Sequence, residues 1–292
     1  MMMTETASET AFETTVHKTV FLAVEKPKVW EFLTRADKLG QWFHPAQQDL
    51  VEGQEYTLLN GLDGDRMCWG KVEKMRAPDY MRWSFTVGAL DGHMTTVEWK
   101  LEAAPGGTRL SLVHSGLPTS GEGFGLVLAL DHGWHGFTLN LQEQTRAEAT
   151  GDYCATIVVP AAPDVARKAI RDEMHLWWSD RIEPRTGGAV IRFNRSHVDF
   201  DMEDGDTQMA MTWTCRDANM IIENVEDTSE WKGTRLLWQI APLGTGSRVT
   251  LTHEGLNAGL ACQDVCTRGW QQYFENSLRA HLSGQAPSPQ TH

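Results

Sequence analysis

The sequence VEWKLEAAPGGTRLSLVHSGL, residues 97–117, recurs as LLWQIAPLGTGSRVTLTHEGL at residues 236–256. The two stretches align without gaps at an offset of 139, since 253 minus 114 equals 139 for His253 and His114. Tryptophan, glycine, arginine, leucine, histidine, glycine and leucine coincide. Self-similarity of this kind indicates that one structural unit is present twice.

Further landmarks recur at an offset of 136, and the difference of three residues implies compensating insertions in loops. The matched landmarks are Pro27 with Pro163, Trp42 with Trp178, and the Gly-Trp pairs at 133–134 and 269–270. We therefore predict two tandem domains, at residues 15–148 and 152–283, that arose by duplication. The flanking residues 1–14 and the Pro/Ser/Gln-rich residues 284–292 are predicted to be disordered tails.

Each copy shows the same order of elements. The first opens with an alternating strand near 16–24, and Pro27 then starts a short helix at its permitted first-turn position. Strands follow near 54–59, 67–76, 80–87, 93–103 and 108–115. An amphipathic helix over 124–146 closes the first copy, and one near 260–282 closes the second. This order predicts an α+β fold of two curved antiparallel sheets, each wrapped around a long C-terminal helix.

Length and charge narrow the class of protein. A chain of 292 residues suits two domains, and 41% apolar residues suffice to fill two cores. The formal charge of −13 argues against nucleic acid or an anionic membrane surface as a partner. Residues 1–10 lack the pattern of a secretory signal, and the longest apolar run, residues 124–130, is too short for a bilayer. We expect a cytoplasmic protein without membrane insertion, whose five scattered cysteines are reduced.

The alternation of the repeated strands indicates which side chains face the closing helix. His114 shares a face with Leu110 and Leu112, and His253 shares one with Val249 and Leu251. Two histidines are thus predicted at equivalent inward positions. Each is either a polar anchor in an apolar cavity or a core histidine hydrogen-bonded to the backbone near the loop.

Large apolar side chains crowd the same faces, among 12 tryptophans in all. They can line a cavity for a flat ligand, or they can simply fill the core. Together with His114 and His253, the predicted cavity-lining residues are Met81, Trp83, Phe85, Trp99, Trp134, Met211, Trp213, Trp238, Trp270 and Tyr273.

The sequence contains no specific catalytic constellation. Cys262 and Cys266 are spaced i, i+4 on one helix face, but only His253 is a plausible third metal ligand, so we expect buried thiols and no metal. Asp131 and His135 lie one turn apart, and a solvated helix face is favoured over a general base. Phosphate-binding loops, nucleophile elbows and zinc-protease helices are absent from the sequence, so no catalytic residue and no cofactor are predicted.

The second copy resembles the SRPBCC, or START-like, superfamily. The likeness lies in WWS at 177–179, EWKGT at 230–234 and THEGL at 252–256, followed by Cys262, Cys266 and the Gly-Trp pair. This series is similar to a bacterial branch near the activator-of-Hsp90-ATPase homologue group. The first copy resembles the broader group through WGKVEK at 69–74 and HSGL at 114–117.

The resemblance implies a helix-grip fold whose cavity, between sheet and closing helix, holds lipids, polyketides or other apolar ligands. We therefore expect binding of a small hydrophobic ligand for sequestration, transport or self-protection. One alternative is a cyclase/aromatase or hydrolase that uses His114 or His253 as acid or base. Another is a chaperone-associated or regulatory protein, although residues 1–15 are too short for the Hsp90-binding domain of the eukaryotic co-chaperones, so Hsp90 itself is not an expected partner.

Overall fold

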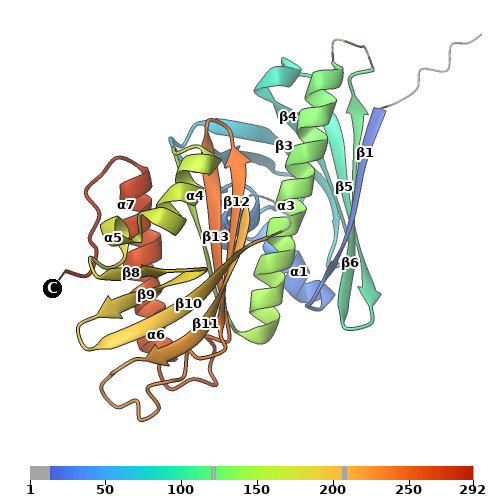
Figure 1. Ribbon diagram of the computed structural model, residues 1–292. Helices are drawn as coiled ribbons and strands as arrows, with labels where there is room; N and C mark the ends of the chain where they lie inside the picture. Colours follow the sequence, from blue (N-terminus) through green and yellow to red (C-terminus); the bar gives the residue numbers. More distant parts are fainter. Residues whose placement is uncertain (1–13, 120, 122, 206–208, 292) are drawn as a thin grey trace, which may run out of the picture. The chain divides into compact units, whose positions relative to one another are not determined.

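The computed structural model describes residues 14–119, 121, 123–205 and 209–291. They form two compact units (Figure 1). Of the described residues, domain 1 comprises 14–60 and 64–142, and domain 2 comprises 61–63 and 143–291. The predicted N-terminal tail lies, except for Thr14, outside the described residues.

Domain 1 is built on a six-stranded antiparallel sheet in the order β1-β6-β5-β4-β3-β2. Its strands are β1 (Thr14–Leu22), β2 (Glu55–Leu59), β3 (Arg66–Arg76), β4 (Tyr80–Val87), β5 (Thr95–Ala104) and β6 (Gly107–Leu117). Helices α1 (Lys26–Thr34) and α2 (Ala36–Trp42) follow β1, a short turn η1 (Gly88–Leu90) follows β4, and α3 (Phe124–Thr150) follows β6. Pro27 occupies the first turn of α1, as the sequence predicts.

Domain 2 repeats this plan with seven strands in the order β7-β13-β12-β11-β10-β9-β8. The strands are β7 (Tyr153–Val159), β8 (Ile182–Arg185), β9 (Gly188–Phe193), β10 (Ser196–Asp204), β11 (Ala210–Asn219), β12 (Arg235–Leu243) and β13 (Gly246–Glu254). Helices α4 (Pro163–Asp172) and α5 (Met174–Trp177) follow β7. The predicted α+β fold of two sheets with helices is confirmed.

The repeated stretch forms the same hairpin in both domains. On β5 and β6, Val97 lies opposite His114, and on β12 and β13 Leu236 lies opposite His253. Trp99 and Trp238 both follow two residues later on the same face, and both are buried. The gapless alignment in the sequence therefore corresponds to an identical strand register, which sets both histidines inward.

The closing helix of domain 2 has an unusual middle. Helix α6 (Gln263–Trp270) runs into the π-helical segment η2 (Gln271–Leu278) and then into α7 (Arg279–Leu282). Gln271 and Arg279, at the two junctions, keep right-handed helical dihedral angles, so the rod continues without a break. Segments of π-helix often occur at functional sites because they shift the helix face by one residue.

One landmark pair needs correction. The sequence matches Trp42 to Trp178, but in the structure Trp42 matches Trp177. The Trp42 indole donates to the Phe32 carbonyl at 2.8 Å, and the Trp177 indole donates to the Ala169 carbonyl at 2.9 Å. Both indoles also meet the matched core tryptophan edge-on, Trp99 in domain 1 and Trp238 in domain 2. The offset at this tryptophan is therefore 135, one less than the offset of 136 between Pro27 and Pro163.

Phe43 is consequently the counterpart of Trp178. Phe43 lies 5.1 Å from Trp134 between ring centroids, and Trp178 lies 5.0 Å from Trp270. The sequence could not show this pairing, because the two aromatic residues differ in type and lie beside a second aromatic residue.

The C-terminal segment differs from the expected disordered tail. Gln290 pairs with the strand-like stretch after α5: its N–H donates to the Trp178 carbonyl at 2.8 Å, and its carbonyl accepts from the Asp180 N–H at 3.0 Å. Its side chain accepts from the Tyr273 hydroxyl at 3.1 Å. The Ser288 N–H donates to the Ser277 hydroxyl at 2.8 Å. Low hydrophobicity suggested disorder, whereas backbone hydrogen bonding to domain 2 supplies the order.

We predict that a chain ending at Ser283 loses about 1–2 kcal/mol of the stability of domain 2. Three hydrogen bonds at Gln290 disappear, and each contributes about 0.5–1.5 kcal/mol, less where it is exposed. Urea unfolding followed by circular dichroism measures the change. A chain that lacks only residues 291 and 292 is the control, and equal midpoints for the two truncations would contradict a structural role for the segment.

Candidate functional site

A buried histidine connects the sheet of domain 2 to its closing helix. The Trp270 indole N–H donates to Nδ1 of His253 at 3.0 Å. Nε2 of His253 lies 2.9 Å from the Thr234 hydroxyl, which itself donates to the Trp231 carbonyl at 2.7 Å. Because the hydroxyl proton is used on the carbonyl, Nε2 must carry the proton that the hydroxyl oxygen accepts. The imidazole is therefore the neutral Nε2–H tautomer.

Domain 1 contains the same arrangement. The Trp134 indole donates to Nδ1 of His114 at 3.0 Å, and Nε2 of His114 lies 2.7 Å from the Thr95 hydroxyl. Thr95 donates in turn to the Phe85 carbonyl at 2.7 Å. We call this arrangement the Trp–His–Thr link. It occurs twice, with matched residues, and both histidines are fully buried.

Burial keeps the two histidines neutral. Burial lowers the pKa of His114 to about 4 and that of His253 to about 3. Protonation would also place a hydrogen on Nδ1, where it would face the indole N–H and break the hydrogen bond from the tryptophan. Both nitrogens are engaged within the protein, so the geometry leaves neither free to exchange a proton with a substrate. The partners are a threonine and a tryptophan side chain, not the backbone groups that the core-histidine interpretation expected.

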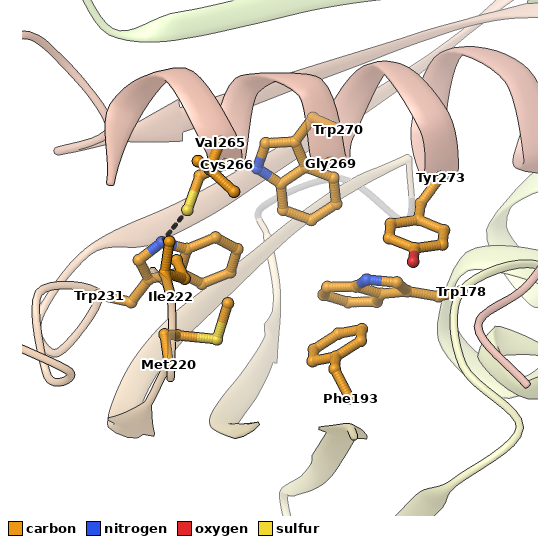
Figure 2. Close-up of a pocket in the computed structure, with 10 residues that line it drawn as sticks. All are labelled: Trp178, Phe193, Met220, Ile222, Trp231, Val265, Cys266, Gly269, Trp270 and Tyr273. Carbon is orange, nitrogen blue, oxygen red and sulfur yellow. Dashed lines mark hydrogen bonds between the residues drawn. The ribbon is translucent and has the colours of Figure 1, made fainter. Parts of the chain in front are cut away.

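Beside this link, domain 2 has a pocket of about 230 Å³. Helix α6 and the first turn of η2 form one wall, and residues from the sheet and its loops form the other (Figure 2). The pocket is lined by Trp178, Phe193, Met220, Ile222, Trp231, Val265, Cys266, Gly269, Trp270 and Tyr273. None of these side chains carries a carboxylate or a basic group, so the lining is apolar apart from a thiol and a phenol.

Aromatic rings shape the pocket. The Trp231 and Trp270 rings are stacked at 5.9 Å with an angle of 16° between their planes. Trp178 contacts Trp270 at 5.0 Å and Phe193 at 5.7 Å. The indole N–H of Trp270 is used by His253 and that of Trp231 by the Cys266 sulfur, at 3.2 Å. These two tryptophans therefore offer a ligand ring faces rather than hydrogen-bond donors.

In domain 1 the corresponding rings pack on one another. Phe137, which matches Tyr273 at the offset of 136, lies 4.6 Å from Phe43 and 5.1 Å from His44 between ring centroids. Phe43 is also stacked on Trp134. These contacts occupy the side of the Trp–His–Thr link on which domain 2 has its pocket.

The predicted lining residues divide between pocket and core. Trp270 and Tyr273 line the pocket of domain 2, and His253 lies directly behind it. Those in the hydrophobic core of domain 1 are Met81, Trp83, Phe85, Trp99 and Trp134, and those in the core of domain 2 are Met211, Trp213 and Trp238. Alternation within strands identifies an inward face, but it does not separate a filled interior from an open one.

The sequence did not identify the other eight residues that line the pocket. Trp178, Trp231 and Cys266 stood in the motifs that carried the family resemblance, and that was a usable signal. Met220 and Ile222 follow the end of β11 in an irregular segment, where no periodicity indicates their direction. Gly269 contributes by having no side chain, since a Cβ built there meets no atom within 4 Å.

Two other candidate clusters are resolved by their contacts. Among the described residues, no three His, Cys, Asp or Glu side chains converge as a metal site. Asp131 forms an ion pair with Lys18 at 2.8 Å, and His135 is exposed.

None of the helices in the described part of the chain is long and apolar enough to span a membrane.

Comparisons with known proteins agree with the repeated architecture. A family model described as activator of Hsp90 ATPase homolog 1-like protein matches residues 23–143 and 168–283. No curated protein sequence matches the chain.

Several solved structures are similar at low sequence identity. DynU16, from the dynemicin biosynthetic locus, is 20% identical over 89% of this chain and 93% of that chain, with a TM-score of 0.40. The Aha1 dimer from Colwellia psychrerythraea is 18% identical over 45% of this chain and 96% of that chain, with a TM-score of 0.39. CalU16 from Micromonospora echinospora is 18% identical over 47% of this chain and 86% of that chain, with a TM-score of 0.37.

We predict that Trp270→Phe destabilises domain 2 by about 1–3 kcal/mol more than Trp238→Phe does. Both changes remove similar ring volume, but only the first leaves a buried histidine nitrogen without its donor. The Trp238 indole N–H has no hydrogen-bond partner among the described residues. Chemical unfolding of the two variants makes the comparison, and equal losses would show that the link contributes nothing beyond packing.

We also predict that the protein loses stability as the pH falls from about 6.5 toward 4. The unfolded chain binds protons below the ordinary histidine pKa of about 6.5, whereas folded His114 stays neutral to about pH 4. The contribution of His114 to the free energy of unfolding is therefore fully present above pH 6.5. It falls by about 3 kcal/mol between pH 6.5 and pH 4. Unfolding midpoints are measured at each pH. Plotted against pH, they should change less steeply for the His114→Gln variant than for the wild type. The exposed His17→Gln is the control, and an unchanged slope in the His114 variant would refute the assignment.

Proposed function

The chain belongs to the activator of Hsp90 ATPase homolog 1-like family, and we propose that it binds a small, uncharged, ring-containing molecule in the pocket of domain 2. The observation that carries this proposal is the pocket of about 230 Å³ beside the Trp–His–Thr link. Ligand pockets are typically concave, apolar and lined by aromatic side chains. Because the histidines would not react with the bound molecule, its binding would serve sequestration or transport.

The lining specifies the chemistry of the ligand. Stacked Trp231 and Trp270 present flat faces, which favour a planar molecule. No ionic side chain lines the pocket, so burial of a charged ligand would be unfavourable. The Tyr273 hydroxyl is already bonded to Gln290. The volume lies below the roughly 300–1,000 Å³ of pockets for drug-sized ligands, which suits a molecule of one or two rings.

The two domains are not equivalent in this proposal. Phe137 packs against Phe43 and His44 in domain 1, whereas the matched Tyr273 borders the pocket in domain 2. Domain 1 would then retain the fold without the binding role. A catalytic role for His114 or His253 receives no support from the geometry, because the protein's own groups engage both nitrogens of each ring.

We predict that Gly269→Leu abolishes binding of naphthalene, used as a planar uncharged probe. A Cβ at Gly269 meets no atom within 4 Å, so a leucine side chain starts in open space at the pocket wall and takes up pocket volume, and leucine favours a helix more than glycine does. Intrinsic tryptophan fluorescence and calorimetry should show affinity weakened at least about tenfold, with the melting temperature kept or raised.

The matched control is Gly133→Leu, at the corresponding position of the closing helix in domain 1. It should leave naphthalene affinity unchanged. Naphthoate, which adds a carboxylate to the same rings, should bind at least about tenfold more weakly than naphthalene. Equal binding by the wild type and Gly269→Leu would place the ligand elsewhere and would sink the proposal.

A further inference from the structure

Two cysteines lie at the wall of the pocket. Cys262 precedes α6 and Cys266 lies one turn later, and both are buried. The Cys266 sulfur lines the pocket and accepts a hydrogen bond from the Trp231 indole at 3.2 Å (Figure 2). Cys262 lies four residues before Cys266, so the two side chains are neighbours on the same side of the helix. One sulfur thus faces the pocket, and the second thiol lies one helical turn away from it.

The fold does not require these thiols. At the offset of 136, the closing helix of domain 1 has Leu126 and Leu130 in place of Cys262 and Cys266. The supporting residues also differ. At the offset of 139, Glu230 and Trp231 are replaced by Asp91 and Gly92. The thiol pair and its indole donor therefore occur together in domain 2, beside the aromatic pocket, and are absent from the matched positions of domain 1.

Two contacts make Cys266 the more acidic thiol of the pair. The neighbouring Cys262 thiol and the hydrogen bond from the Trp231 indole lower the pKa of Cys266 despite burial and the nearby Glu230 carboxylate, and the same pairing raises the pKa of Cys262. The other cysteines behave differently, since burial raises the pKa of Cys154 to about 11 and that of Cys215 to about 12. Nucleophilic reactivity of cysteine follows its thiolate character and its access to the reactant.

We propose that Cys266 and Cys262 form a redox pair that reduces organic hydroperoxides in the pocket of domain 2. The Cys266 thiolate attacks the terminal oxygen of ROOH, so that an S–O bond forms and the O–O bond breaks. The alkoxide leaves and takes a proton to become ROH. The Cys262 sulfur then attacks the resulting sulfenic acid, an S–S bond forms and water leaves. Two thiols are oxidised to one disulfide, and one hydroperoxide is reduced to an alcohol.

The second step needs the two sulfurs to approach. Side chains four residues apart on a helix have Cβ atoms about 5–6 Å apart, and a disulfide needs about 3.5–4.5 Å. Cys262 is the N-terminal cap of α6, outside the regular helix, and the hydrogen bond from the Cys266 N–H to its carbonyl is 2.9 Å long. A movement of about 1–2 Å at a helix end is sufficient, and it leaves the rest of the rod in place.

The lining determines which peroxide is used. An apolar, aromatic pocket accepts the organic group of a substituted hydroperoxide, whereas hydrogen peroxide gains nothing from it. This step rests on the proposed ability of the pocket to bind apolar molecules. Reduction of the disulfide by an external dithiol would complete the cycle.

The test uses the full-length, reduced protein and cumene hydroperoxide. Without reductant, we expect one cumyl alcohol per chain and a Cys262–Cys266 disulfide in the peptide mass map. With dithiothreitol, turnover should continue, at least about tenfold faster with cumene hydroperoxide than with hydrogen peroxide. Cys266→Ser should form no alcohol above background, and Cys262→Ser should form one alcohol and stop at a sulfenic acid that dimedone traps.

Cys154→Ser is the matched control, because Cys154 is more exposed than Cys266 and should still be irrelevant. The inference would be overturned if the wild type consumed cumene hydroperoxide no faster than the Cys266→Ser variant does. Oxidation of Cys154 before Cys266 would also overturn it. Equal rates for the two peroxides would overturn the assigned substrate class. Naphthalene binding by Cys262→Ser/Cys266→Ser separates the two proposals, since binding without peroxide reduction leaves the ligand proposal standing alone.

Discussion

In both domains, a neutral imidazole on the last strand accepts a hydrogen bond from an indole on the closing helix and donates one to a threonine beside the neighbouring strand. A helix packed on a sheet through apolar contacts alone can slide or rotate at small cost. The Trp–His–Thr link removes that freedom, because an unpaired imidazole nitrogen in a dry interior costs about 1–3 kcal/mol. Each helix is thereby fixed in depth and rotation against its sheet, and the ring positions around the link follow from it.

The surroundings of the Trp–His–Thr link differ between domain 2 and domain 1. The π-helical segment begins directly after Trp270, and Tyr273 lies within it. The C-terminal segment bonds to Tyr273 and to the backbone on both sides of Ser179, so the pocket has ordered walls at that end. A duplicated fold can diverge in this way because each copy keeps its own core. The sulfur pair and its indole donor belong to domain 2.

The sequence predicted the architecture well, since a gapless repeat fixes strand register wherever one face must be buried. It also placed His114 and His253 inward, but not their partners. Thr95 and Thr234 precede or begin a strand, and nothing in their local pattern marks them as acceptors. The pocket was harder to predict. Whether Phe137 or Tyr273 borders a filled or an open space depends on side-chain volumes at Phe43, Trp178 and Gly269, which lie far apart in the chain.

Two neutral imidazoles, each hydrogen-bonded through both ring nitrogens, hold the closing helices to their sheets. Long-range proton–nitrogen NMR spectra of the histidine rings between pH 7 and pH 5 report the tautomer and the charge of each ring. We expect His114 and His253 to remain in the Nε2–H tautomer throughout, with slowly exchanging indole protons on Trp134 and Trp270. A ring of either residue that becomes protonated near pH 6.5, or an Nδ1–H tautomer at neutral pH, would contradict it.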